Sequence, residues 1–277
     1  MRVSTDSSTP HWRRQIAAGA ATLALLSLTA AAAPVLAPYP PAQQNLTADL
    51  APPDIGHPLG RDKLGRDVLS RIIYGARVSL AVGLSAVLLY AGLGVLIGAT
   101  AGFAGGRIDF WVMRLVDILL AFPGILLAIA MTAALGPGLT NVIIALSLIG
   151  WTGYARLVRA EVMAVAARDH VEAARALGVP TPALIRRHVL PLIAAPLMVQ
   201  ATFGMAGAIV AEASLSFLGL GVQPPTPSWG AMVNDGRSFL LVAPHLVLYP
   251  GIAIFLTVLG LNALGDGVRA YLDVRGR

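Results

Sequence analysis

The sequence predicts an all-α, polytopic membrane protein with six transmembrane helices, and three observations lead to this class. Of the 277 residues, 56% are hydrophobic and only 12% are charged, whereas soluble domains usually carry about 25% charged residues. Mean hydropathy is correspondingly high, at +0.74. Apolar runs of about 20 residues, the length that crosses the hydrocarbon of a bilayer, recur along the chain. A water-soluble domain is excluded, because too little polar surface remains to face water.

Six windows of the chain are apolar enough to span a membrane. We expect the spans at residues 16–37, 78–102, 115–135, 139–155, 189–211 and 246–265. The fourth window is the shortest, and we expect its helix to continue past Arg156. The sequence Gly136-Pro137-Gly138 predicts a tight break between the third and fourth spans, because glycine and proline interrupt regular structure.

The distribution of the basic residues predicts that both termini face the cytoplasm. Lysine and arginine accumulate in cytoplasmic loops close to membrane spans, and with both termini inside, the cytoplasmic segments hold 14 of the 20 basic residues. The stretch 64–80 alternates charged and apolar residues at helical spacing, which predicts an amphipathic element at the outer interface. The expected order is a cytoplasmic N-terminus (1–15), a first transmembrane helix (16–37), an extracytoplasmic loop (38–77), a transmembrane core (78–270) and a cytoplasmic tail (271–277).

The first window has a second interpretation, as a secretory signal. Two arginines, Arg13 and Arg14, precede the apolar run, and four alanines at 30–33 resemble a signal cleavage site. The apolar core of a signal usually has about 7–15 residues, whereas residues 16–33 are all uncharged. The greater length favours a retained membrane anchor and leaves a cleaved signal open.

The composition also excludes several kinds of chemistry. The chain has no cysteine, which removes disulfides and thiolate sites. Its only lysine, Lys63, precedes Leu64 instead of the serine or threonine of a P-loop, so ATP-driven work needs a partner. The net charge of +6 comes without the basic stripe that nucleic-acid binding uses. The histidines lack metal-ligand spacing and the serines lack a catalytic partnership, so we expect no metal site, no cofactor and no catalysis in this chain.

A helix–stop–helix pattern occupies residues 161–191. We expect a helix at 161–177, with Gly178 in the left-handed position that ends it. Thr181 is then expected to cap a second helix that starts with Pro182. Small side chains on the first helix leave a low surface onto which another protein can close, unless the segment is an ordinary amphipathic connector. These small side chains belong to Ala173, Ala174 and Ala176.

This segment resembles the signature loop of binding-protein-dependent ABC importer permeases. The resemblance rests on Glu172-Ala173-Ala174, on Gly178 and on Leu190-Pro191. The run from Arg187 to Pro191 is similar to the branch of the family that carries peptides and nickel. In that family the loop forms a coupling helix that docks in a cleft of the ATPase subunit. The resemblance implies this coupling role for Glu172, Ala173, Ala174, Gly178, Arg187, Leu190 and Pro191.

Three further stretches, at 64–80, 114–123 and 212–230, resemble the second permease of dipeptide and oligopeptide systems. The resemblance covers about residues 57–273 and implies the type I ABC importer permease fold. It further implies a homologous second permease, two ABC ATPase subunits that bind ATP and Mg, and an extracytoplasmic solute-binding protein. Short peptides are the implied substrate, with nickel chelates and glutathione as alternatives. An ion-coupled secondary transporter is the rival class, but it often has repeated halves, and none is evident here.

Two acidic residues, one within a predicted span and one at the outer end of another, are candidates for the pathway or its gate, because intramembrane acids are costly. Asp117 lies three residues beyond Arg114 on the same helical face, which predicts an ion pair at the inner end of the span. The alternative role for Asp117 is contact with a passing peptide, beside a bend at Phe122-Pro123. Glu212 lies near the outer end of the fifth span, where we expect it to be in water.

Glycines recur every fourth residue in the second span, at Gly94, Gly98, Gly102 and Gly106. Such a ridge of small residues lets two helix backbones approach closely in lipid. We expect the ridge to pack against another helix of this chain, with a seam against the sister permease as the alternative.

Overall fold

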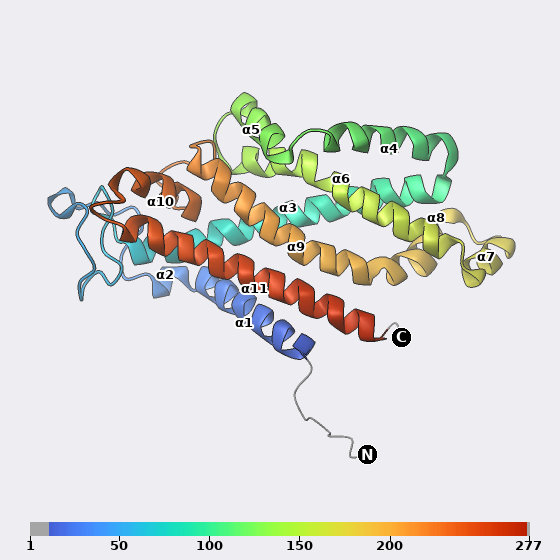
Figure 1. The fold of residues 1–277 in the computed structure, drawn as a ribbon, viewed down its shortest axis with the longest axis horizontal. Helices are drawn as coiled ribbons and strands as arrows, with labels where there is room; N and C mark the ends of the chain where they lie inside the picture. Colours follow the sequence, from blue (N-terminus) through green and yellow to red (C-terminus); the bar gives the residue numbers. More distant parts are fainter. Residues whose placement is uncertain (1–10, 276–277) are drawn as a thin grey trace, which may run out of the picture.

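The computed structural model describes residues 11–275, so the expected terminal segments 1–15 and 271–277 lie partly outside the described residues (Figure 1). The elements in chain order are α1 (His11–Ala31), α2 (Ala33–Leu36), η1 (Leu46–Ala48), α3 (Val68–Ala104), α4 (Gly106–Leu120), α5 (Gly124–Leu135), α6 (Leu139–Ala166), α7 (Asp169–Ala176), α8 (Thr181–Leu184), the π-helical η2 (Ile185–Val189), α9 (Leu190–Phe217), α10 (Trp229–Gly236), η3 (Arg237–Phe239) and α11 (His245–Arg275). Within residues 11–275 no strand is formed, which confirms the all-α class.

Five helices of the described chain are long and apolar enough to cross a membrane. Most of the first window lies in α1, and the second, fourth and sixth windows lie in α3, α6 and α11. The fifth belongs to one continuous helical run, Thr181–Phe217, in which α8, η2 and α9 follow each other without a break. The helix of the fourth window continues past Arg156 to Ala166, as predicted.

The third window is not a single straight helix, and its bend lies beside Phe122-Pro123, where one was considered from the sequence. Helices α4 and α5 meet at an angle of 85°, and together they count as a sixth span only if the bent pair is taken as one. The break lies at residues 121–123, where Pro123 caps the start of α5. Proline supplies no backbone N–H and disfavours helical geometry in the residue before it, which accounts for the break beside Phe122.

The amphipathic stretch at 64–80 is not a separate interfacial element, which corrects the prediction. Most of it forms the first turns of α3, which runs uninterrupted for 37 residues. Asp67 caps this helix, because its carboxylate accepts the backbone N–H of Ser70 at 2.7 Å. Ser70 and Arg71 are buried against the protein. The polar face of the stretch therefore packs inside the protein, while residues 37–67 form an irregular loop with one short turn at η1.

The glycine ridge packs α3 against α6, as predicted. A Cβ added at Gly94 would lie 2.3 Å from the Cβ of Tyr154, and one at Gly98 would lie 2.4 Å from the backbone oxygen of Ala155. Gly102 makes a similar approach to the backbone of Arg159. The fourth ridge residue, Gly106, opens α4 and faces open space. Three of the four ridge glycines therefore serve contact within this chain rather than a seam with another subunit.

Helix α1 packs lengthwise along α11, at one side of the bundle (Figure 1). Leu23 of α1 packs against the buried Leu261 of α11. Further along, the rings of Trp12 and Tyr271 are tilted against each other with their centroids 5.0 Å apart. The first helix therefore belongs to the packed body of the protein.

The bundle has two distinct ends (Figure 1). Helices α7 and α8 lie at one end, toward which the first residues of α1 and the last residues of α11 also point. The irregular loop 37–67 and α10 lie at the opposite end. This separation places the helix–stop–helix segment and the long loop on opposite sides, as the predicted topology requires.

Candidate coupling segment and buried polar networks

The helix–stop–helix segment forms a projecting corner between α6 and α9. The expected single helix at 161–177 is instead two helices, because α6 ends at Ala166 and α7 begins at Asp169. Gly178 has a φ of 82°, which is the left-handed conformation predicted for it. Its N–H donates to Arg175 O at 3.0 Å, and the N–H of Val179 donates to Ala174 O at 3.2 Å. These two bonds form the Schellman motif that ends α7.

The second helix of the corner starts one residue earlier than predicted. Pro180 occupies the capping position and Thr181 is the first helical residue, so the expected role of Thr181 as a cap is wrong. Further along, the N–H of Leu190 donates to Ile185 O, five residues back. This π-type turn lies directly before Pro191, which has no N–H to offer. Such π-turns are frequent at functional sites.

Burial divides the predicted coupling residues into two groups. The exposed group consists of Glu172, Ala173, Gly178, Arg187 and Pro191. Ala174 is buried and Leu190 is half-buried, and both pack in one apolar cluster with Leu184 and Val189. The small surface predicted for Ala174 therefore faces the interior of this chain. The exposed members remain available to another protein.

Asp117 is paired with a different arginine from the one predicted. Its carboxylate lies 2.7 Å from Arg156 of α6, whereas Arg114 lies over the ring of Phe110. Both members of the pair are more than half exposed, with side-chain exposures of 57% for Asp117 and 54% for Arg156. A second pair, between Asp109 and Arg159, also joins α4 to α6. Asp109, Asp117 and Arg159 of these pairs line an open groove of about 430 Å³ along α4, and Arg156 does not.

Glu212 is fully buried, with 0% of its surface exposed, so the expectation that it lies in water is wrong. Its position near the end of a span suggested contact with water. In the structure, α10 and the loop that follows α9 both fold back over it. Ser216 donates its hydroxyl to Glu212 Oε1 at 2.6 Å, and the Ser216 oxygen accepts the N–H of Val222 at 3.2 Å. The second oxygen, Oε2, makes no hydrogen bond of normal geometry in the described part of the chain, although the hydroxyl of Ser228 lies close to the carboxyl group.

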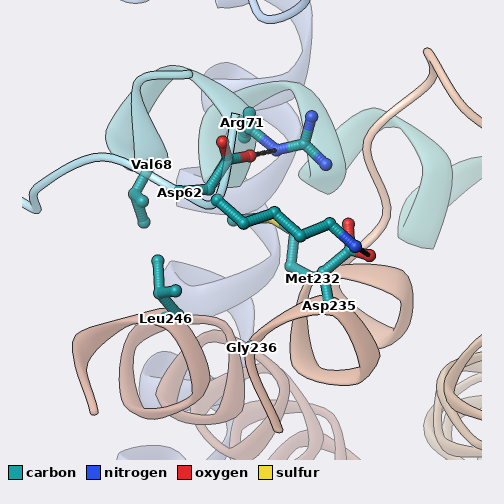
Figure 2. Close-up of a pocket in the computed structure, with 8 residues that line it drawn as sticks. Asp62, Val68, Arg71, Met232, Asp235, Gly236 and Leu246 are labelled. Atoms are coloured by element: carbon teal, nitrogen blue, oxygen red, sulfur yellow. Dashed lines mark hydrogen bonds and ion pairs between the residues drawn. The ribbon is translucent and has the colours of Figure 1, made fainter. Parts of the chain in front are cut away.

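A network of charged side chains joins the long loop to α3 and α10. Asp62 accepts from Arg66 at 2.6 Å and lies 3.4 Å from Arg71 Nε. Asp235 of α10 pairs with Lys63 at 2.7 Å. Figure 2 shows Asp62 and Arg71 pointing toward each other, beside the helix that carries Asp235. An adjacent cavity of about 10 Å³ has room for about one water molecule.

A second polar cluster stabilises the same loop. His57 Nδ1 lies 2.8 Å from Asp67 Oδ1, and both residues are buried. The ring of Tyr39 stacks on that of His57 with the centroids 4.4 Å apart. The backbone N–H of Tyr39 donates to the hydroxyl of Ser70 at 3.1 Å. The loop is therefore bound to the start of α3 by side-chain contacts, together with backbone bonds such as the one from the N–H of Val68 to Gly60 O at 3.1 Å.

Comparison with known families identifies the class of this protein. Residues 94–277 match the family described as binding-protein-dependent transport system inner membrane component. The chain belongs to this family. Residues 17–53 match the N-terminal TM domain of oligopeptide transport permease C. The second match covers the segment for which a span and a secretory signal were both open, and it favours the span.

Curated relatives cover most of this permease. It is 47% identical over 255 residues to the di/tripeptide transport system permease protein DppC of Pseudomonas aeruginosa, covering 90% of this chain and 84% of that protein. It is 45% identical over 221 residues to the glutathione transport system permease protein GsiD of Escherichia coli O157:H7, covering 80% and 73%. The dipeptide transport system permease protein DppC of Alkalihalophilus pseudofirmus is 45% identical over 246 residues, covering 89% and 81%.

A solved structure has the same fold. The inward-facing MetNI methionine ABC transporter superposes with a TM-score of 0.55 and 19% identity, over 73% of this chain and 95% of that one. The type I ABC importer permease fold implied by the sequence motifs is thereby confirmed.

Two features of this permease were missed by sequence reasoning. Leu177, the last residue before Gly178, is 86% exposed at the tip of the projecting corner. An apolar residue directly before a predicted helix stop was the available signal. The network around Asp62 and Asp235 was also missed, because Asp235 of α10 lies far along the chain from Lys63, its partner in the loop.

Proposed function

We propose that this permease carries short peptides across the plasma membrane as one of two homologous permease subunits of an ABC importer. Both termini lie in the cytoplasm, and the loop at 38–67 and the segment at 218–244 face outside. The observation that carries the proposal is the projecting α7–α8 corner. It ends in exposed Leu177 and Gly178 and lies at the end of the bundle toward which the first residues of α1 and the last residues of α11 point. A protein that docks there from the cytoplasm meets the permease on a preformed surface.

In this proposal the projecting corner is the element that docks on an ATPase subunit. Glu172, Ala173 and Gly178 contact the cleft of the ATPase, while Ala174 and Leu190 hold the corner onto the bundle from inside. Arg187 adds a positive charge to the exposed side. ATP and Mg are bound by the two ATPase subunits, and this chain contributes no catalytic group.

The transport cycle is alternating access. ATP binding closes the ATPase subunits, the docked corners approach one another, and the spans open outward toward a solute-binding protein. Each ligand shifts this equilibrium only through its different affinity for the two states. Binding protein loaded with peptide therefore raises ATP hydrolysis by favouring the outward-open state.

The groove between α4 and α6 is the candidate peptide contact in this chain. Asp117 borders it together with Arg114 and Arg159, so carboxylate and guanidinium groups face the same space. A peptide carries an amino group at one end and a carboxylate at the other, which matches this pairing of charges. Glu212, at the outer end of α9, is the candidate gate residue.

Glutathione is the second candidate substrate, because a glutathione permease is 45% identical to this chain. Glutathione is itself a tripeptide derivative, so the two candidates share their polar backbone and charged termini. Competition between labelled dipeptide and unlabelled glutathione for uptake separates them. Nickel chelates are tested in the same competition.

Uptake by the reconstituted transporter tests the proposal. The permease is placed in proteoliposomes with its sister permease, both ATPases and binding protein, and ATP-dependent entry of a labelled dipeptide is measured. We expect uptake that requires ATP and binding protein, and none with the permease alone. Uptake by the permease alone, driven by a proton or sodium gradient and indifferent to ATP, would refute the importer in favour of a secondary transporter.

A further inference from the structure

One continuous helical run links the two ends of the permease. The run Thr181–Phe217 begins in the projecting corner and ends at the outer side of the bundle. Its inner end carries Arg187 and Pro191 of the corner, and its outer end carries Glu212 and Ser216. The corner and the surroundings of Glu212 therefore lie on one continuous helical run, which contains Pro196 within α9.

The outer end of this run is joined to the loop that follows it through Glu212. The carboxylate accepts from Ser216, and Ser216 in turn accepts from the backbone of Val222. A Cβ at Gly221 would lie 1.9 Å from the Ser216 oxygen, so the loop passes directly against this hydroxyl. The acid and the hydroxyl are both buried. The chain of bonds therefore forms away from competing water.

The same carboxyl group faces the start of α10. Ser228, fully buried, lies near the Glu212 carboxyl group and caps α10 by accepting the N–H of Ala231 at 3.2 Å. The next residue, Trp229, donates its indole N–H to the backbone oxygen of Ile72 in α3 at 3.0 Å. Glu212 thus lies where α9, its following loop, α10 and α3 meet.

We propose that Glu212 is a positioning residue that fastens the outer end of α9 to the start of α10, so that displacement of the coupling corner moves the outer face of the permease. This inference rests on the proposed importer function and extends it to a specific side chain. The outer face is the side that the binding protein contacts, so the link through Glu212 couples binding-protein contact on the outside to displacement of the corner, and the reverse. Reciprocity follows from thermodynamic linkage between the two sites.

The chemistry of Glu212 argues against a purely structural role. Burying an acid costs desolvation free energy that its bonds to Ser216 and the nearby Ser228 only partly offset, and an apolar residue of similar size would fill the space without this cost. Buried polar groups that are only partly satisfied call for a functional explanation. A hydrogen-bonded link that breaks in one state of the transporter and forms again in the other is such an explanation. Apolar packing alone provides no hydrogen bond that could differ between the two states.

The test compares variants in the complete transporter, with ATPases, sister permease and binding protein in proteoliposomes. The readout is the ratio of ATP hydrolysis with peptide-loaded binding protein to hydrolysis without it. Glu212→Ala and Ser216→Ala remove the link. Glu212→Gln keeps an oxygen that accepts from Ser216. The matched control is Ser214→Ala, on the same helix, because Ser214 bonds only to the backbone of its own helix at Val210.

We expect the ratio to fall at least about fivefold in Glu212→Ala and Ser216→Ala, within the usual range of coupling between sites. Glu212→Gln and Ser214→Ala should keep most of it. If the Glu212→Ala permease does not assemble with its partner subunits, the ratio measured for Ser216→Ala tests the inference instead. Wild-type ratios in both link variants, or a loss in Glu212→Gln as deep as in Glu212→Ala, would overturn the inference. Absence of ATP-dependent uptake in the wild-type transporter would instead overturn the proposed function, so the two failures are distinguishable.

Discussion

The contact between α3 and α6 offers a quantitative test of the fold, through Gly98. A Cβ at this position would lie 2.4 Å from the backbone oxygen of Ala155, whereas ordinary contact begins at 3.4 Å. The two helices must therefore separate by about 1 Å to admit a single methyl group. The obstacle is backbone, which cannot rotate away as a side chain can.

The expected cost of Gly98→Ala follows from two opposing contributions. Replacing glycine by alanine in a helix gains about 1 kcal/mol of intrinsic propensity. Forcing an extra methyl group into a packed interface costs about 1–3 kcal/mol. Gly92 is the matched control, because it lies on the same helix and a Cβ there meets nothing within 4 Å. The difference between Gly98→Ala and Gly92→Ala therefore isolates the clash.

The measurement is the free energy of unfolding in mixed micelles of detergent and graded SDS, followed by circular dichroism. We expect Gly98→Ala to unfold at a lower SDS fraction than Gly92→Ala, with a difference in unfolding free energy of about 1–3 kcal/mol. Equal unfolding free energies of the two variants would show that α3 and α6 do not approach closely at Gly98. The described packing of the core would then be wrong.

Three further predictions address the proposed coupling, pathway and topology. Gly178→Asp should leave the permease in the membrane but abolish ATP-dependent uptake, because it places a side chain at a φ of 82° and an unpaired charge at the docking surface. Glu172→Lys should have the same effect. Wild-type uptake in both variants would show that this segment is not the coupling element. Asp117→Asn should lower the unfolding free energy by less than about 1 kcal/mol, since the pair with Arg156 is exposed. A large fall in peptide uptake at unchanged stability would then indicate a pathway role for Asp117. Unchanged uptake would exclude that role. Single cysteines at Ala48 and Ala176, in this cysteine-free chain, should react with an impermeant thiol reagent from opposite sides of the membrane, and labelling from the same side would refute the topology.

Much of the helical content was predictable because lipid imposes one strict requirement. Every backbone polar group must be satisfied within its own segment, so a long apolar run such as that of α3 or α11 must be helical. The left-handed turn at Gly178 was predictable for a local reason, since glycine adopts this conformation without steric cost. The glycine ridge on α3 was predictable as a packing surface, because only small residues allow such close approach.

The failed predictions share a different origin, in contacts between distant segments. Asp117 was assigned to Arg114 because the two are neighbours on one helix, but the packing of α4 on α6 places Arg156 closer. Glu212 was assigned to water because it lies near the end of a span, but the following loop and α10 cover it. The bend at Pro123 was suspected, yet its angle depends on how α5 packs against α6.

The sequence by itself determined the membrane class, the approximate spans, the family and the position of the projecting corner, because each of these depends on composition or on residues close together in the chain. Only the tertiary structure decided which charges pair, which acid is buried and which helices touch. The partners of Asp62, for example, lie on its own loop and on α3, and Asp235 reaches Lys63 from α10. The pair between Asp235 and Lys63 joins segments far apart in the chain, and no local pattern predicts it, since an ion pair forms wherever folding brings the two charged groups within reach.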